Sequence, residues 1–274
     1  MTIDINNLIK LAQTALISNQ TQPFSIYSCK QKQSLRHVPI FNPLIVFVLS
    51  GKKVLGGEMQ SSCNEGQFLF LSENPEVTFS NIPGKHGYLA LFIEFQYEDF
   101  EGIQLTSKNA QRFLIGDMNA ALVQSISQLI ELSDTSPEVI WNIRRKELIH
   151  LLCFYGYHDI ISMISKPRIN HQLIDVFKKD PSTRWDIKRM SKKLAMSEST
   201  LRRKLKLEGT GFRDLNTQVR LAHGMHLIQT TDDSISVISE KCGYQSQSRF
   251  TEGFKNRFGT TPGKLRKTLQ DTDE

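Results

Sequence analysis

The sequence predicts an α+β protein of two domains, in which a β-rich part precedes an all-helical part. Along the chain, short apolar runs separated by turn residues give way to apolar residues spaced three and four apart. The net charge also changes sign, because residues 1–165 carry 12 Lys and Arg against 15 Asp and Glu (net −3) and residues 166–274 carry 22 against 13 (net +9). At 274 residues, the chain approaches the size at which a single hydrophobic core stops growing. We therefore expect one domain at 1–165 and another at 166–274, with the boundary near the polar, proline-containing residues 165–170.

The first domain begins with segments that have strand character. Residues 44–49 form a continuous apolar run, ended by Gly51, with the length and β-branched content of a strand buried on both faces. Further strand candidates lie at 67–71, 77–80 and 88–96, and the breaks between them contain Gly and Pro, which favour turns. Short strands at this spacing predict a small barrel or sandwich.

The pattern then changes to helix. Apolar pairs recur at three- and four-residue spacing over residues 121–130, and a second such pattern runs over 140–155 after a helix-start sequence that ends at Pro137. The apolar stripe of these two helices can be internal core, or it can pair with a second copy of the chain. The sequence leaves both interpretations open.

Composition and motif content narrow the function classes. No run approaches the ~18 apolar residues of a membrane span, and no secretory signal is visible, so we expect a cytoplasmic protein without membrane contact. The four cysteines lack metal-ligand spacing and are expected to be buried thiols. The histidines of the first domain form no H-x-H pair, and nucleotide and hydrolase motifs are missing. We therefore expect no enzyme activity, no metal and no cofactor.

The second domain contains a first segment with the plan of a helix-turn-helix, residues 185–212. A short helix ends near Leu194, and Ser197 is placed to cap a second helix by accepting a backbone N–H. In that helix Leu201 and Leu205 are four apart and point to a core. The polar and basic residues on its outer faces are Ser199, Arg202, Arg203, Lys204 and Lys206. This arrangement is typical of a helix that reads the major groove of double-stranded DNA.

A second segment repeats the plan. Residues 234–242 form a short helix, Gly243 lies in the turn, and the next helix places Phe250 and Phe254 toward a core. The residues left to reach base edges are Gln247, Ser248 and Arg249. Gln pairs with adenine and Arg with guanine, so these side chains carry the chemistry of direct base readout.

The segment 236–266 resembles the signature of the AraC/XylS transcription regulators. The matching positions are Ile238, Cys242, Gly243, Tyr244, Ser246, Ser248, Phe250, Phe254, Lys255, Phe258, Gly259, Thr261, Pro262 and Arg266. The first segment matches less well, with Ser191 where the family usually has Ala, Leu205 where it often has Phe, and Gly209 one residue early, as in some virulence-type members. Upstream, residues 44–51 and 65–75 resemble the cupin-type sensor domain of many members.

The resemblance implies an N-terminal cupin-like β-barrel with two helices and a C-terminal domain of two helix-turn-helix subdomains, joined by a long helix over 214–229. The two recognition helices would enter successive major grooves, about 34 Å apart. The residues implied to contact bases are Ser199, Arg202, Arg203, Gln247, Ser248 and Arg249. Those implied to contact phosphates are Lys204, Lys206 and Lys255. The family also implies promoter DNA and RNA polymerase as partners, and activation of transcription.

The first domain is expected to sense a small molecule, to mediate dimerisation, or both. Its apolar side chains form core or line a cavity for an apolar effector: Phe24, Ile26, Phe41, Val46, Phe47, Phe68, Phe70, Phe79, Phe92 and Phe95. The virulence-type resemblance suggests a fatty-acid-like ligand, with Arg36 or His37 as its carboxylate partner. One alternative is a first domain that docks a regulatory protein instead of a ligand. A more remote one is a cupin enzyme with a DNA-binding tail.

Overall fold

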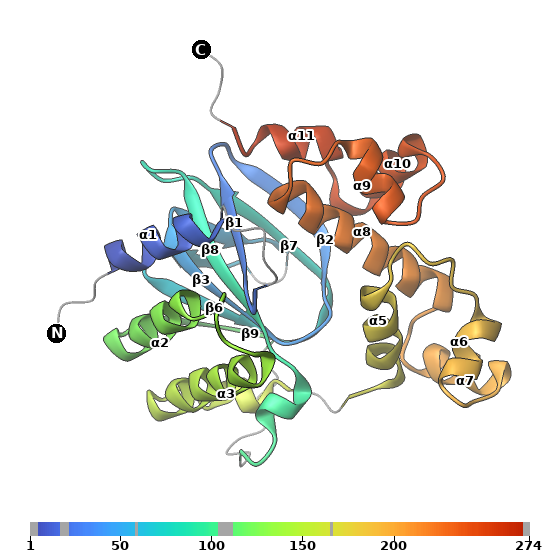
Figure 1. Cartoon of the computed structure of the whole chain (residues 1–274), viewed down its shortest axis with the longest axis horizontal. Helices are drawn as coiled ribbons and strands as arrows, with labels where there is room; N and C mark the ends of the chain where they lie inside the picture. The colour runs from blue at the N-terminus through green and yellow to red at the C-terminus, as the bar shows by residue number, and fades with distance from the viewer. Residues whose placement is uncertain (1–4, 17–21, 58–59, 104–111, 165–166, 271–274) are drawn as a thin grey trace. The chain divides into compact units, whose positions relative to one another are not determined.

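A computed structural model describes residues 5–16, 22–57, 60–103, 112–164 and 167–270 (Figure 1). The chain separates into two compact units, residues 1–165 together with 268–274, and residues 166–267. The second domain predicted from the sequence, 166–274, includes residues 268–274, which group with the first unit. Among the described helices, none is long and apolar enough to cross a membrane.

The first unit contains two antiparallel sheets. Its strands are β1 (Ser25–Cys29), β2 (Gln33–Ile40), β3 (Leu44–Ser50), β4 (Lys52–Leu55), β5 (Ser62–Asn64), β6 (Gln67–Leu71), β7 (Asn74–Ile82), β8 (Tyr88–Glu94) and β9 (Phe113–Asp117). One sheet has the order β1-β8-β3-β6-β9 and the other the order β2-β7-β4-β5. The predicted cupin-like α+β fold is confirmed, although the strands are divided between two sheets and do not close into one barrel.

The sequence of strand β3 is apolar throughout because both faces of the strand are buried. Ile45, Phe47 and Leu49 belong to one buried cluster, and the alternate residues Val46 and Val48 belong to another. Side chains of a strand alternate between faces, so both faces of the five-stranded sheet are covered at this position. The second cluster joins residues of both sheets, which places it in the interior between them.

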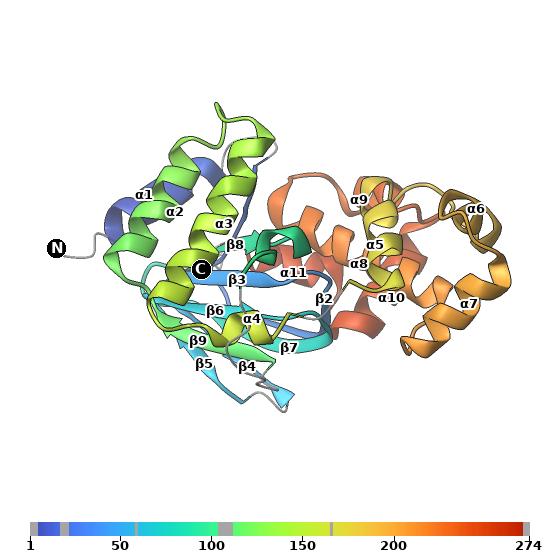
Figure 2. The same cartoon turned by 90° about the horizontal axis from the view of Figure 1, so that it is seen from below.

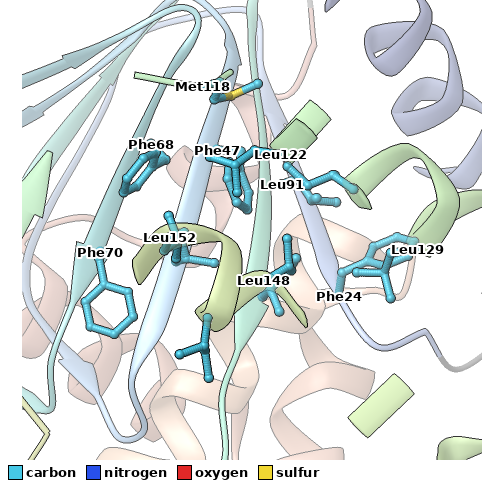
Figure 3. Close-up of a cluster of buried hydrophobic side chains, with 14 of the residues drawn as sticks. Phe24, Phe47, Phe68, Phe70, Leu91, Met118, Leu122, Leu129, Leu148 and Leu152 are labelled. Carbon is cyan, nitrogen blue, oxygen red and sulfur yellow. The ribbon is translucent and has the colours of Figure 1, made fainter. Parts of the chain in front are cut away.

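The other face of the five-stranded sheet is covered by three helices, which lie side by side along it (Figures 1 and 2). They are α1 (Ile5–Leu16), α2 (Ala120–Glu131) and α3 (Glu138–Phe154). Figure 3 shows Phe47, Phe68 and Phe70 of the sheet beside Leu122 of α2 and Leu148 of α3. Most of the aromatic residues proposed above as core or cavity lining therefore lie in this helix-side core. The shorter elements of the unit are the 3₁₀ helix η2 (Tyr97–Phe100) and α4 (Asp159–Ser162).

The interior between the sheets also holds a buried polar chain. The Lys53 side chain is 2% exposed, and its Nζ donates to Asn81 Oδ1 at 2.6 Å. The Asn81 amide donates to Gln33 Oε1 at 3.0 Å, and the Gln33 amide donates to Thr268 Oγ1 at 2.8 Å. Burial lowers the pKa of Lys53 from its ordinary 10.5 to about 7, against a smaller opposing effect of the thiols of Cys63 and Cys29.

The second unit is all-helical, as predicted. Its helices are α5 (Ile169–Lys179), α6 (Ile187–Lys193), α7 (Glu198–Leu207), α8 (Phe212–Thr230), α9 (Ile235–Lys241), α10 (Gln247–Phe258) and α11 (Pro262–Lys267). Helices α6 and α7 form the first predicted helix-turn-helix, and α9 and α10 form the second. The long helix expected over 214–229 is α8, which begins two residues earlier and ends one residue later.

A glycine in the middle of α8 allows the second helix-turn-helix to pack against this helix. A Cβ atom added to Gly224 would lie 2.7 Å from the ring of Phe250 and 3.2 Å from Cys242 Sγ. A mid-helix glycine costs about 1 kcal/mol of helix propensity relative to Ala. Here that cost is offset by the close approach of the buried Phe250 ring.

The substitution Gly224→Ala should lower the free energy of unfolding of the second unit by about 1–3 kcal/mol, because the new methyl group overpacks a filled contact. The matched control is Gly253→Ala in α10, where a Cβ would meet Leu221 at an ordinary 3.8 Å. That control should be neutral or stabilising, by up to about 1 kcal/mol. Calorimetric unfolding of the two full-length variants measures both effects, and equal stability of the two would contradict the packing argument.

The lowered pKa of Lys53 should make the free energy of unfolding rise with pH from about pH 7 upward. The unfolded chain keeps the Lys53 proton up to its ordinary pKa of 10.5, whereas the folded chain releases it near 7, so the unfolded state binds more protons in this window. Compared with a Lys53→Met variant, the wild-type slope should be steeper by up to about 1.4 kcal/mol per pH unit. Urea unfolding at about pH 7.5 and 8.5 measures the difference, and parallel slopes would refute the shift.

Candidate nucleic-acid interface

Helix α7 has one buried side and one polar side. Ser197 caps its start by accepting a hydrogen bond from the Thr200 backbone N–H at 3.2 Å, as predicted. Leu201 and Leu205 are at most 2% exposed. The residues that share the opposite face, at spacings of three, four and seven, are the exposed Ser199, Arg202, Arg203 and Lys206. Lys204 is exposed as well but lies to one side of this face.

The ion pair between Arg202 and Glu198 within α7 is weak. Arg202 Nη2 lies 3.8 Å from Glu198 Oε2, and both side chains are about half exposed, at 64% and 45%. An exposed pair at spacing i, i+4 stabilises a helix by only about 0.3–0.5 kcal/mol. Arg202 can therefore exchange this carboxylate for a base edge or a phosphate at small cost.

Helix α10 repeats the arrangement with an aromatic core side. Ser246 accepts a hydrogen bond from the Arg249 N–H at 3.4 Å, and Phe250, Phe254 and Phe258 are fully buried. Neighbouring rings lie 5.7 and 4.7 Å apart between centroids. These contacts fix the rotation of the helix about its axis, and so they determine which residues face outward.

The exposed residues of α10 are not quite the set that the sequence predicted. Gln247, Ser248, Arg249 and Lys255 are all exposed. At 100° per residue, however, the face opposite the phenylalanines is centred on Arg249, Glu252 and Asn256. Gln247 lies on the phenylalanine side and is exposed because it is the first residue of the helix. Sequence reasoning missed Glu252 and Asn256, although their spacing of three and seven from Arg249 was a usable signal.

Two arginines fasten α8 to the segments beside it. Arg220 Nε donates to Pro181 O at 3.0 Å and its Nη2 donates to Thr183 O at 2.8 Å, in the connection that precedes α6. Arg266 Nε donates to Ile228 O at 3.3 Å and its Nη1 donates to Asp233 O, just before α9. Arg266 is the last position of the signature, and these contacts give it a structural role: it ties α11 to the end of α8.

Helix α7 is tied to the start of the second unit. Glu208, which follows α7, accepts hydrogen bonds from the backbone N–H groups of Ile169 and Asn170, each at 2.9 Å. These N–H groups belong to the first turn of α5 and have no partner within that helix. A carboxylate at a helix N-terminus is electrostatically favourable. The position of α7 is therefore coupled to the point where the chain enters the second unit.

The predicted effector residues of the first unit lie at its surface. Arg36 and His37 are on β2, where the pairing register with β7 shifts between Leu35 and Val38. His37 adopts a left-handed backbone (φ 49°), and its Nδ1 lies 3.2 Å from Glu76 Oε2. Neither residue belongs to the buried clusters of the unit. The interior cation is Lys53, which the sequence analysis did not single out.

Metal chemistry finds no support in the described part of the chain, where no group of three or more His, Cys, Asp or Glu side chains could hold a metal ion. All four cysteines are buried free thiols, as expected from their spacing.

Comparison with known proteins places the second unit in a family. A family model described as a helix-turn-helix domain matches residues 190–268. The transcriptional activator PerA of Escherichia coli is 29% identical over 154 residues, which cover 55% of this chain and 54% of PerA. The E. coli regulator GadX is 30% identical over 125 residues, which cover 44% of this chain and 46% of GadX. The chain thus matches about half the length of these curated relatives.

Solved structures show the same fold over nearly the whole chain. An apo variant of ToxT from Vibrio cholerae covers 92% of this chain and 100% of its own, with a TM-score of 0.67 and 14% identity. Wild-type ToxT with a bound unsaturated fatty acid covers 93% of this chain and 98% of its own, with a TM-score of 0.62 and 14% identity. The second unit, with the signature carried by α9 to α11 and the matching helix-turn-helix region, is therefore similar to the corresponding part of the AraC/XylS regulators, and the chain shares the fold of ToxT.

Proposed function

We propose that the chain regulates transcription by sequence-specific binding to promoter DNA and that it acts as an activator. The observation that carries this proposal is the pair of helices α7 and α10, each capped by a serine, anchored on one side by buried apolar residues and polar on the other. Both helices lie in residues 166–274, whose net charge of +9 favours association with a polyanion. The names of the relatives PerA and the urease operon transcriptional activator support activation.

The exposed residues of the two helices divide by chemistry. Arg and Gln side chains can form paired hydrogen bonds to guanine and adenine in the major groove, and Ser can bond to either. We assign this role to Ser199, Arg202, Arg203, Gln247, Ser248 and Arg249. Lysine is a point charge suited to phosphate, which positions a protein on the duplex without reading its sequence. We assign that role to Lys204, Lys206 and Lys255.

For the first unit, we propose a sensor of a small apolar effector that also contributes to dimerisation. The fatty acid bound to ToxT supports an acid of that kind, since the two proteins share a fold. Dimerisation is supported by α3, whose outer surface exposes Val139, Ile143 and Phe154 at 60%, 56% and 80%. RNA polymerase, as the target of activation, follows from the family alone.

Selection of bound sequences from random duplex DNA with the full-length protein tests the central proposal. The expected result is a motif of two short blocks about one helical turn apart, because the two recognition helices enter successive major grooves. A double variant with Arg203→Ala and Arg249→Ala serves as the control and should lose one specified base pair in each block. Salt-sensitive binding without any enriched sequence would show a general polyanion binder and would overturn the proposal.

Single substitutions separate base readout from phosphate contact. Replacing Arg249 with Ala should weaken binding to the selected operator by about 1–3 kcal/mol and relax specificity at one base pair. Replacing Lys255 with Ala should weaken binding to all sequences alike and lower the dependence of log Kd on log salt by about one unit. Fluorescence anisotropy titrations at several salt concentrations measure both. Unchanged operator affinity in Arg249→Ala would reject the assignment of α10.

A further inference from the structure

The two helix-turn-helix segments differ in charge although they share a plan. Residues 184–208, from two positions before the cap of α6 to the residue after α7, carry nine Lys and Arg against three Asp and Glu (net +6). The corresponding residues 232–259, around α9 and α10, carry four against four (net 0). Of the net charge of +9 in residues 166–274, the first segment therefore supplies +6 and the second segment none.

Helix α6 concentrates cations on one face. Met190 and Ser191 are buried, so at 100° per residue the opposite face is centred between positions 189 and 192. The exposed side chains on and beside this face are Lys188, Arg189, Lys192 and Lys193. Within the part of the chain that the structure describes, none of the three lysines forms an ion pair. Cations this close together repel one another, and a polyanion that lies along the face would relieve the repulsion.

Arg189 is held in a defined place on this face. Its guanidinium lies 4.5 Å from the centre of the Trp185 ring, and its backbone N–H donates to the capping Asp186 at 2.7 Å. The Trp185 indole in turn donates to Asp180 O at 3.3 Å, in the segment that Arg220 ties to α8. A side chain that is already ordered loses less conformational entropy when it binds. One cation of α6 is therefore preorganised for an anion at the helix surface.

Helix α9 is the matching helix of the second segment, and it lacks such a cluster. Counted from the capping residues Asp186 and Ser234, the positions equivalent to the four cations are occupied by Ser236, Val237, Glu240 and Lys241. The Lys241 ammonium is neutralised by Asp233, whose Oδ2 lies 2.6 Å from the lysine Nζ. The same helix-turn-helix plan thus forms without outward unpaired cations, so the fold itself does not require the cluster on α6.

We propose that the outward face of α6 binds backbone phosphates of duplex DNA beside the groove that α7 enters, and that the first helix-turn-helix supplies most of the electrostatic affinity of the protein. This inference rests on the proposed DNA-binding role of α7 and α10. Helix α6 packs against α7 (Figure 1), and the first helix of a helix-turn-helix crosses the DNA backbone. Duplex DNA carries one negative charge per about 1.7 Å of its axis, so a face with a cluster of cations can meet several phosphates.

The proposal gives the two segments different tasks. Phosphate contacts hold a protein on any duplex and make its affinity depend on salt, whereas base contacts distinguish one sequence from another. The first segment would anchor the protein on DNA of any sequence. The second segment, without net charge, would contribute mainly through the bases that α10 reads.

A matched pair of substitutions tests the proposal at equivalent positions of the two helices. Lys193→Gln in α6 should lower the dependence of log Kd on log salt by about 0.9 units, the value for one lost phosphate contact, whereas Lys241→Gln in α9 should leave it unchanged. The double variant Lys192→Gln and Lys193→Gln should lower it by about 1.8 units and weaken binding to all duplexes alike, by roughly tenfold or more at about 0.1 M salt. Because the substituted side chains are exposed, the variants should keep the wild-type Tm.

Fluorescence anisotropy titrations of the full-length proteins, from about 0.05 to about 0.3 M salt, measure these slopes. Wild-type slopes in both α6 variants would overturn the proposal. So would slopes that fall equally in Lys193→Gln and Lys241→Gln, since the charge of α6 would then have no special role.

Ethylation of single phosphates in a duplex that the wild-type protein binds tests where the contact lies. Ethylation removes the charge of a phosphate, so it should interfere with wild-type binding at phosphates beside one block of the operator. Those positions should no longer interfere in the double variant of Lys192 and Lys193. Unchanged interference in that variant would contradict a direct contact between these lysines and the backbone.

The result is distinguishable from failure of the proposed function. Selection without an enriched sequence, together with a slope that falls in the α6 variants, would reject sequence-specific regulation and leave the phosphate-binding face of α6 supported. An enriched motif together with an unchanged slope would support the proposed function and reject the role of α6.

Discussion

The contact between Phe250 and Gly224 is the constraint on which the arrangement of the second unit depends. Phe250 belongs to the buried side of α10, and a Cβ atom on Gly224 of α8 would lie 2.7 Å from its ring. Because the ring fills the place of a side chain on α8, it fixes both the distance and the rotation of α10. The outward face of α10 follows from this rotation. A recognition helix can read DNA only if its polar face is held in a defined direction, so a packing contact in the core determines a property of the surface.

Much of this second unit could be predicted from local sequence. Serine caps, apolar residues at four-residue spacing and the signature around Gly243 placed α7, α9 and α10 close to their observed bounds. The outward face of α10 was predicted less well. Gln247 and Ser248 look equally exposed in the sequence, and the three- and seven-residue spacing that places Glu252 and Asn256 beside Arg249 was not used. The role of Gly224 could not be predicted from local sequence, because it depends on contact with the ring of Phe250, 26 positions further along the chain.

The first unit was harder to predict for a physical reason. Strands with a continuous apolar run, such as β3 and β6, were recognisable because both of their faces are buried. Strands β2 and β4 mix charged and apolar residues and were missed. In β4, the pair Lys52 and Lys53 resembles a solvated turn, but alternation directs one lysine outward and the other into the interior. No local pattern distinguishes the two, since the outcome depends on pairing with β7, which lies more than twenty residues away.

The two units bury different kinds of cation: arginines in the second unit and a lysine in the first. In the second unit, Arg220 and Arg266 donate to backbone carbonyl oxygens, which do not titrate, and a guanidinium stays charged at all physiological pH values. Those contacts therefore hold the helices in one arrangement whatever the conditions. In the first unit the buried cation is a lysine, whose charge responds to what lies beside it. A fixed framework suits a surface that must match the spacing of DNA grooves, whereas the buried lysine makes the stability of the first unit depend on pH.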